Sequence, residues 1–257
     1  MRFESRLIIE SDLNHLYRRG ADIFSWVAGE CVRSRGRFTV AISGGSTPRP
    51  MHRMLCEEPY LTAIPWKSTV IFWVDERCVP VDDPASNYGT ARADFLDTVP
   101  IPDSQVHPMP RDLPPREGAS LYERELVHWP QHQTDGIPIF DLICLGIGTD
   151  GHTASLFPGQ EALTETKRLV VSVTGGNPNV ERLTLTLPLI NQAREIVFMV
   201  SGKEKATTLK GILEGPPGIY PAQLIQPVHG NLTWLLDREA ASYLTRMPAI
   251  QMRAKRV

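Results

Sequence analysis

The sequence predicts an α/β fold with a mostly parallel, Rossmann-like doubly wound sheet and helices on both faces. Short apolar runs that suit buried strands alternate along the chain with segments whose apolar residues recur at helical spacing. Polar or glycine-rich turns follow several of these strands. Because ligands bind at the carboxyl edge of the strands in open α/β sheets, we expect the functional site at that edge.

Length and composition narrow the class of protein. The chain has 257 residues, 42% of them apolar, and we expect one domain over residues 1–257 with a small excursion around 98–135. A formal net charge of −2 argues against a nucleic-acid binder, so an anion site must be a local cluster. The four cysteines form no CxxC pair and are interpreted as reduced thiols of a cytoplasmic protein. We expect no membrane partner, because there is no signal-peptide core and no apolar run of spanning length.

The first elements are a helix and a buried strand. Apolar side chains recur at helical spacing from Leu13 to Cys31, and Gly36 offers a stop. The run Phe38–Ile42 predicts a strand that leads into the sequence SGGSTP, residues 43–48. A glycine-rich turn between a strand and a helix presents free backbone N–H groups and the positive end of the helix dipole, which suits an anion.

The candidate anion-binding residues of this turn are Gly44, Gly45, Ser46 and Thr47. Thr47 is a good N-cap, and Pro48 fits the first position of the next helix. The alternative is that the glycines only make a tight turn and hold no ligand.

The second predicted strand, Val70–Val74, delivers Asp75, Glu76 and Arg77 to its carboxyl end, and a helix follows from about Ser86. Acids beside an arginine often form a solvated loop network. Here they arrive at the same sheet edge as the glycine-rich turn, which favours a functional role.

The middle of the chain holds a proline-rich connection and a helix. Six prolines fall between Pro100 and Pro115, which predicts an extended segment without regular structure. A helix is expected over Glu117–His128. His128 and His132 have the spacing of a helical metal pair, but Pro130 separates them and no third ligand is near, so we predict no metal site.

The central strand is the apolar run Leu142–Leu145, which is too short for a helix and suits burial on both faces. Gly146 and Gly148 then allow a sharp turn, and polar residues follow within a few positions. The alternative to a functional loop is that Asp150 and Thr153 cap a helix and His152 is an ordinary loop residue. These polar residues are Asp150, His152, Thr153 and Ser155.

The last third of the chain predicts further strands over Arg168–Val173, the LTLTL run after Arg182, Glu195–Val200 and Leu232–Leu236, with a helix over Arg238–Leu244. Lys203 and Lys205 fall in the first turn of a helix that follows the strand Glu195–Val200. Cations there oppose the helix dipole unless an anion lies between, although both lysines could simply be solvated.

The four suggestive loops each follow a strand and should meet at one sheet edge. This convergence indicates an enzyme that acts on a small anion. The loops are Ser43–Thr47, Asp75–Arg77, Gly148–His152 and Ser201–Lys205.

Together these loops resemble the 6-phosphogluconolactonase family. The resemblance implies hydrolysis of 6-phospho-D-glucono-1,5-lactone to 6-phosphogluconate in the oxidative pentose phosphate pathway, without a metal or an organic cofactor. The partner would be this small sugar-phosphate lactone, and the protein a monomer or a weak homo-oligomer. The matching blocks are SGGSTP (43–48), VDERCVP (74–80), SNY (86–88), LGIGTDGHTASLFPG (145–159), RLTLTLPLIN (182–191), SGKEKA (201–206) and LTWLLD (232–237).

The resemblance also implies roles for single residues. His152 would be the general base, and Asp150 would orient its imidazole or contact a sugar hydroxyl. Phosphate or carboxylate would be held by charged groups, assisted by the Gly44–Thr47 backbone, and sugar hydroxyls by Asp75 and Asn87. The oxyanion could be stabilised by backbone N–H groups or by an arginine. The charged groups implied are Arg77, Arg182 and Lys205.

Two alternatives have different chemistry. Glucosamine-6-phosphate deaminases share a similar DGH loop but continue with Asn-Glu-Pro-Gly, and here Phe157 stands where that glutamate would be. A non-catalytic sugar-phosphate-binding domain is the other alternative. Intact Asp150 and His152 argue against it, as does the lack of a DNA-binding segment before residue 40.

Overall fold

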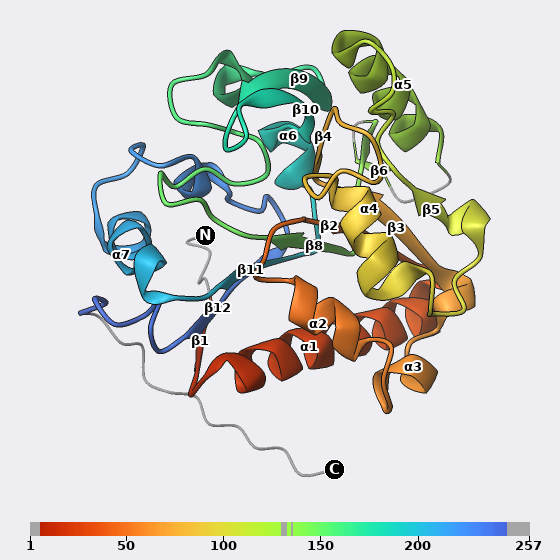
Figure 1. Cartoon of the computed structure of the whole chain (residues 1–257), viewed down its shortest axis with the longest axis horizontal. Coiled ribbons are helices and arrows are strands. Elements are labelled where there is room, and N and C mark those ends of the chain that lie inside the picture. Colours follow the sequence, from red (N-terminus) through yellow and green to blue (C-terminus); the bar gives the residue numbers. More distant parts are fainter. Residues whose placement is uncertain (1–5, 130–132, 135, 246–257) are drawn as a thin grey trace.

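The computed structural model describes residues 6–129, 133–134 and 136–245. Its centre is a seven-stranded sheet in which every neighbouring pair of strands is parallel, as the sequence predicts (Figure 1). The strands in spatial order are β1 (Arg6–Glu10), β12 (Asn231–Asp237), β11 (Glu195–Val200), β8 (Leu142–Leu145), β2 (Phe38–Ile42), β3 (Thr69–Trp73) and β5 (Val106–His107).

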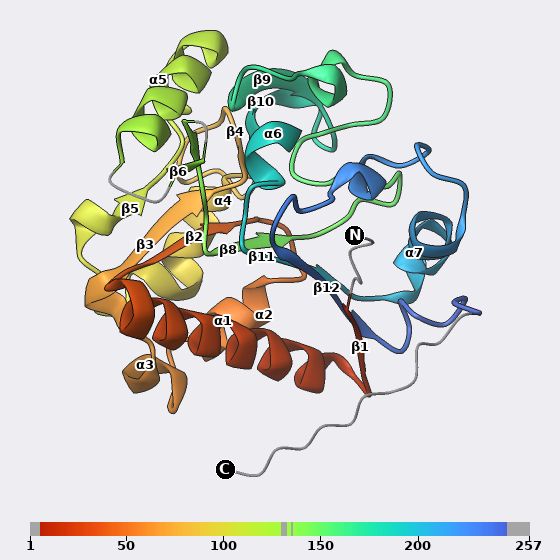
Figure 2. The same ribbon diagram turned by 180° about the vertical axis from the view of Figure 1, so that it is seen from behind.

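Helices lie on both sides of this sheet. Figures 1 and 2 show α1, α2 and α3 on one side, and α6 and α7 on the other together with a second sheet. Helix α1 begins where Asp12 accepts a hydrogen bond from the backbone N–H of His15, and it ends at Gly36 in the left-handed conformation, as predicted. The α-helices are α1 (Leu13–Arg35), α2 (Arg49–Met54), α3 (Tyr60–Ala63), α4 (Asn87–Ala91), α5 (Pro115–His128), α6 (Leu187–Ile190) and α7 (Ala206–Glu214).

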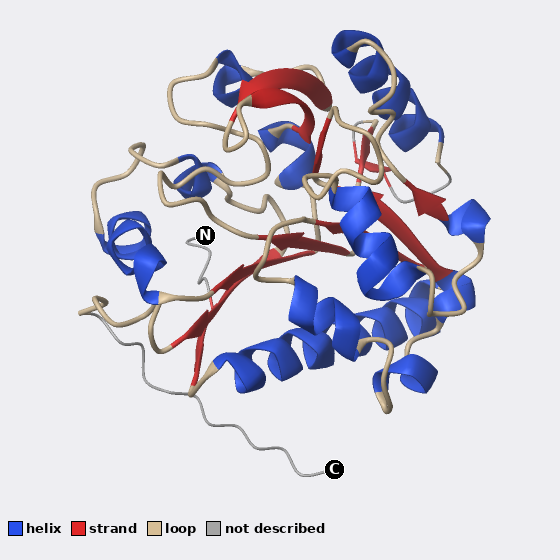
Figure 3. Cartoon of the chain, in the orientation of Figure 1, coloured by secondary structure: helices blue, strands red, loops and turns tan. Residues whose placement is uncertain are grey.

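The second sheet is antiparallel and was not predicted (Figure 3). The sequence suggested that Asp75–Arg77 is a loop and that Arg182 precedes a strand, and both expectations were wrong. The chain leaves the central sheet at Val74, whose N–H donates to Ile42 and whose carbonyl accepts from Leu185. The strands are β4 (Asp75–Arg77), β10 (Val180–Leu185) and β9 (Val170–Gly175).

Two further expectations needed correction. The proline-rich segment contains β5, which pairs with β3 at the sheet edge. The segment 238–244 forms turns and no helix, because the N–H groups of Ser242 and Leu244 donate to carbonyls three residues earlier and make successive turns. Strand β1 was not anticipated. A two-stranded ladder, β6 (Gln133–Thr134) with β7 (Ile137–Pro138), completes the described sheets.

The core of the molecule is a continuous cluster of buried apolar side chains that covers both faces of the central sheet and reaches the second sheet. Phe198 and Trp234 stack across neighbouring strands with ring centroids 4.1 Å apart. None of the helices within the described ranges combines the length and the apolar character needed to cross a membrane.

Candidate active site

The loop that follows β8, residues 146–152, is here called the histidine loop. The N–H of Gly148 donates to the His152 carbonyl at 2.8 Å, and the N–H of Gly151 donates to the Gly148 carbonyl at 3.1 Å. A Cβ at residue 148 would collide with the His152 ring, and Gly151 has φ +79°. Gly148 therefore has the steric reason that the sequence predicts, and Gly151 has one that was not predicted, whereas a Cβ at Gly146 would meet only an ordinary contact.

His152 and Asp150 form a pair at the surface of this loop. His152 Nδ1 lies 2.5 Å from Asp150 Oδ1, which also accepts the backbone N–H of His152 at 3.1 Å. Partial burial raises the pKa of Asp150, but the hydrogen bond from the His152 N–H and the charge of the imidazole outweigh it and lower the pKa below its usual value. No helix follows within residues 151–160, so the helix-cap alternative was wrong.

The pair leaves one imidazole nitrogen available. With Nδ1 facing a carboxylate, the neutral imidazole carries its lone pair on Nε2. The histidine side chain is 29% exposed, which lets a water molecule reach it. This geometry suits a general base.

Phe157 lies beside this histidine. Its ring centroid is 4.7 Å from that of His152, and the Arg182 guanidinium carbon lies 5.6 Å from the same ring. The phenyl group is buried and places no titratable atom next to the imidazole. It therefore contacts both the histidine and the buried arginine.

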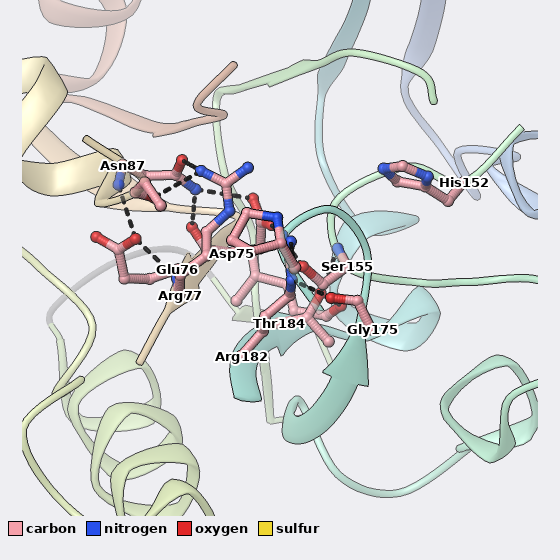
Figure 4. A network of polar contacts seen from close by, with 12 residues as sticks. Asp75, Glu76, Arg77, Asn87, His152, Ser155, Gly175, Arg182 and Thr184 are labelled. Carbon is pink, nitrogen blue, oxygen red and sulfur yellow. Dashed lines mark hydrogen bonds and ion pairs between the residues drawn. The ribbon is translucent and has the colours of Figure 1, made fainter. Parts of the chain in front are cut away.

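Arg182 and Asp75 form a buried network with Ser155 and Thr184 (Figure 4). Ser155 Oγ donates to Asp75 Oδ2 at 2.6 Å, and the Ser155 N–H donates to Thr184 Oγ1 at 3.2 Å. Arg182 Nη1 is 4.0 Å from Asp75 Oδ2. The strand register explains the pairing, because Thr184 lies opposite Asp75.

Arg182 is also tied to the β9–β10 hairpin. Its Nε donates to the carbonyl of Gly175 at 2.8 Å, and its Nη2 donates to the carbonyl of Pro178 at 3.1 Å. Burial lowers the pKa of Arg182, and the positive charge of Arg77 lowers it further. Two neighbouring cations at a sheet edge favour binding of an anion.

Arg77 and Asn87 lie next to this network. Arg77 Nη1 donates to Asn87 Oδ1 at 2.6 Å and to the Ala85 carbonyl at 2.7 Å, while its buried Nε has no hydrogen-bond partner among the described residues. Asn87 Nδ2 donates to the Asp75 carbonyl at 2.8 Å. Ser86 caps α4, so the helix predicted from about this residue is confirmed.

Glu76 is a structural residue that the sequence did not distinguish from its neighbours. Its carboxylate accepts hydrogen bonds from the N–H groups of Arg77, Asn87 and Tyr88, each between 2.7 and 2.8 Å. Burial raises the pKa of Glu76, and these N–H groups counteract part of the rise. Glu76 holds the segment that positions Asn87. In hindsight, the only signal was that a strand would turn this side chain away from those of Asp75 and Arg77.

The glycine-rich turn 43–48 lies against Asn87, because a Cβ at Gly44 would collide with that side chain. Gly45, with φ +93°, and Ser46 are exposed. Thr47 is not an N-cap as predicted: α2 begins one residue later than expected, after Pro48, and has no side-chain cap. Instead Thr47 Oγ1 lies 3.2 Å from Ser201 Oγ.

Lys203 and Lys205 do not lie in the first turn of α7 as predicted: they form a short 3-10 turn, and Lys205 immediately precedes the helix. Lys203 is exposed, whereas Lys205 is half-buried. The contact between Thr47 and Ser201 joins the loop 201–205 to the glycine-rich turn. Thr208 of α7 donates to the Thr149 carbonyl of the histidine loop at 2.6 Å. The structure therefore brings the four predicted loops together.

The described residues contain no group of three or more histidine, cysteine, aspartate or glutamate side chains that could hold a metal ion. His128 is exposed, with Nδ1 2.7 Å from the Arg124 carbonyl. His132, its predicted partner in the rejected metal pair, lies outside the described residues.

Comparison with known proteins gives a family and several relatives. Residues 11–234 match the family described as glucosamine-6-phosphate isomerases/6-phosphogluconolactonase. A 6-phosphogluconolactonase of Synechocystis sp. is 45% identical over 218 residues, which cover 84% of this chain and 88% of the relative. A 6-phosphogluconolactonase of Rattus norvegicus is 40% identical over 231 residues, 88% of each chain. A solved structure of 6-phosphogluconolactonase from Trypanosoma brucei has a TM-score of 0.85 and 30% identity, and the match covers 95% of this chain and 100% of that one.

Proposed function

The chain belongs to the family of glucosamine-6-phosphate isomerases and 6-phosphogluconolactonases, and we propose that within it this protein is a lactonase. It hydrolyses 6-phospho-D-glucono-1,5-lactone to 6-phospho-D-gluconate in the oxidative pentose phosphate pathway. The relatives from Synechocystis and rat support this assignment, since each is named for that activity. The observation that carries it is the His152–Asp150 pair, which leaves one imidazole nitrogen available on an accessible loop.

His152 acts as the general base. Its Nε2 takes a proton from water as the water oxygen bonds to the lactone carbonyl carbon, and Asp150 stabilises the imidazolium that forms. The imidazolium then returns the proton to the ring oxygen as the bond between that oxygen and the carbonyl carbon breaks. The product is the open-chain acid, which ionises. The imidazole supplies the base, so the reaction as proposed uses no metal or organic cofactor.

The phosphate is held by Lys205 and the backbone of residues 44–47. Lys205 precedes α7 and is only half-buried, so its ammonium group has access to a ligand. The guanidinium groups of Arg77 and Arg182 add positive electrostatic potential at the same sheet edge. Protein carbonyls already accept some of their hydrogen bonds.

Contacts of Asp75 and Asn87 with sugar hydroxyls stay a prediction. Asp75 accepts hydrogen bonds from Ser155 and from Asn87, so it also orients these two side chains. An arginine or backbone N–H groups would stabilise the oxyanion, as the sequence suggests.

Two alternatives are less well supported. The deaminase reaction needs a carboxylate that assists the histidine, and the buried ring of Phe157 stands in that place. A binding domain without catalysis would not need an oriented imidazole with an accessible nitrogen.

The direct test is hydrolysis of 6-phospho-D-glucono-1,5-lactone by the purified protein, followed by acid release and corrected for spontaneous hydrolysis. We expect turnover proportional to enzyme concentration. A rate equal to the spontaneous rate at micromolar enzyme would overturn the proposal.

We also propose a single domain and a cytoplasmic location, and a monomer or weak homo-oligomer. Buried side chains of both sheets belong to one continuous cluster, which supports the single domain. The four cysteines are free, which fits a reducing compartment. Some plant relatives, however, are named as chloroplastic forms.

A further inference from the structure

Helix α7 contacts the histidine loop through Thr208. This side chain is buried, and its hydroxyl donates to the carbonyl of Thr149 at 2.6 Å. Thr149 directly precedes Asp150. Thr208 lies in the first turn of α7, three residues after Lys205, which immediately precedes the helix. The helix end that carries Lys205 is therefore joined to the loop that carries the base.

Tyr220 makes a second contact between the same two parts. A Cβ at Gly151 would collide with one edge of the Tyr220 ring, and a Cβ at Gly211 would lie 2.6 Å from its Cε2. The ring is thus enclosed between the histidine loop and α7 at two positions that only glycine fits. The N–H of Ala222 adds a hydrogen bond to the Gly151 carbonyl at 3.1 Å.

Gln223 fixes this tyrosine on the helix. Its Oε1 accepts hydrogen bonds from the N–H groups of Ile219 and Tyr220 at 2.9 and 3.0 Å. Its Nε2 contacts the carbonyls of Gly211, Ile212 and Pro216 at 3.0–3.3 Å. The side-chain amide therefore fastens the segment 216–223 to the second half of α7.

From these contacts we propose that Thr208 and Tyr220 are positioning residues, which hold the histidine loop on α7. The base His152 and the anion-binding Lys205 then move as one unit, and the reacting group keeps a constant distance from the bound phosphate. Misplacement of a catalytic group by about 1 Å can cost about 100-fold in rate. The role in catalysis rests on the proposed function, whereas the effect on the loop does not.

The first test measures the loop without catalysis. Hydrogen exchange at the amides of Gly148 and Gly151 is compared in the wild type, Tyr220→Leu and Tyr220→Phe. We expect exchange to become about tenfold faster in Tyr220→Leu, because opening the loop costs about 1.4 kcal/mol less. Tyr220→Phe keeps the ring and should match the wild type. Equal exchange in all three proteins would overturn the proposal.

The second test measures the consequence for catalysis. Tyr220→Leu should lower kcat on the phosphorylated lactone by about 10- to 100-fold, with KM changed less than about threefold. In a His152→Ala background the same substitution should change kcat by less than about threefold, because its target is gone. The same loss in both backgrounds would show that Tyr220 does not act through His152.

A milder pair of variants covers the case in which Tyr220→Leu does not fold. Thr208→Val removes the hydroxyl at similar volume, and Thr208→Ser restores it. We expect Thr208→Val to show faster exchange at Gly151 and a lower kcat, and Thr208→Ser to recover both. If the wild type itself fails to hydrolyse the lactone, the proposed function is wrong, and the exchange measurements still decide whether the loop is held.

Discussion

The histidine loop and the buried network around Asp75 differ in how their charged groups are satisfied. The His152 side chain is 29% exposed and has a single carboxylate partner on a glycine-rich turn. The side chains of Arg182 and Asp75 are 3% and 8% exposed and lie on paired strands. A catalytic histidine needs a ring nitrogen that is free to accept a proton and is accessible to water. A buried charged side chain instead needs hydrogen-bond or ion-pair partners, because burial without them costs free energy. The first region is therefore suited to catalysis and the second to holding the site together.

The largest expected effect on stability comes from breaking the buried network. Asp75→Ala should lower the free energy of unfolding by about 3–5 kcal/mol, because it removes the nearest carboxylate from the buried Arg182 guanidinium and the acceptor from Ser155 Oγ. Urea denaturation measures the change. Asp82→Ala, at an exposed position of the neighbouring loop, is the control and should stay within about 0.5 kcal/mol of the wild type. If Asp75→Ala were as stable as this control, the structural role of the network would be wrong.

A smaller effect is expected at Lys205, which is accessible like the histidine but has no catalytic task. Lys205→Ala should reduce kcat/KM on the phosphorylated lactone by about 10- to 150-fold, the value of a charge-assisted contact of about 1.5–3 kcal/mol. The much weaker activity on unphosphorylated glucono-1,5-lactone should barely change. Lys203→Ala, at the exposed lysine two residues earlier, is the matched control. Equal losses on the two lactones would assign the phosphate to Arg77 or Arg182.

The smallest expected signal is ammonia release from glucosamine 6-phosphate. Phe157 gives the histidine loop an apolar neighbour where the deaminase reaction needs a carboxylate. A coupled assay for ammonia should therefore show only background. Clear turnover would mean that the protein belongs to the isomerase branch of its family.

The sequence was sufficient for the histidine loop because the features that define it are local. Gly148, Asp150 and His152 lie within five consecutive positions, and their contacts are made among themselves. The central strands of the parallel sheet were predictable for a similar reason, since they are short apolar runs, whereas the edge strands β1 and β5 were missed.

The buried network and the contacts of α7 could not be predicted in this way. Strand β4 is polar and only three residues long, so nothing in its composition indicates that it pairs with β10 about a hundred residues later. Tyr220 lies against Gly151 across a separation of about 70 residues in sequence. Such contacts depend on the packing of complete elements, and a single sequence contains no signal for them.

The most direct test of this account is a measurement of kcat for His152→Ala on 6-phospho-D-glucono-1,5-lactone, with unfolding of the same sample recorded in urea. We expect kcat to fall by about 10²- to 10⁴-fold, the usual contribution of a general base. The free energy of unfolding should stay within about 0.5 kcal/mol of the wild type, because the side chain is partly exposed and makes one side-chain hydrogen bond. Near wild-type turnover in a folded His152→Ala protein would contradict the assignment of His152 as the base.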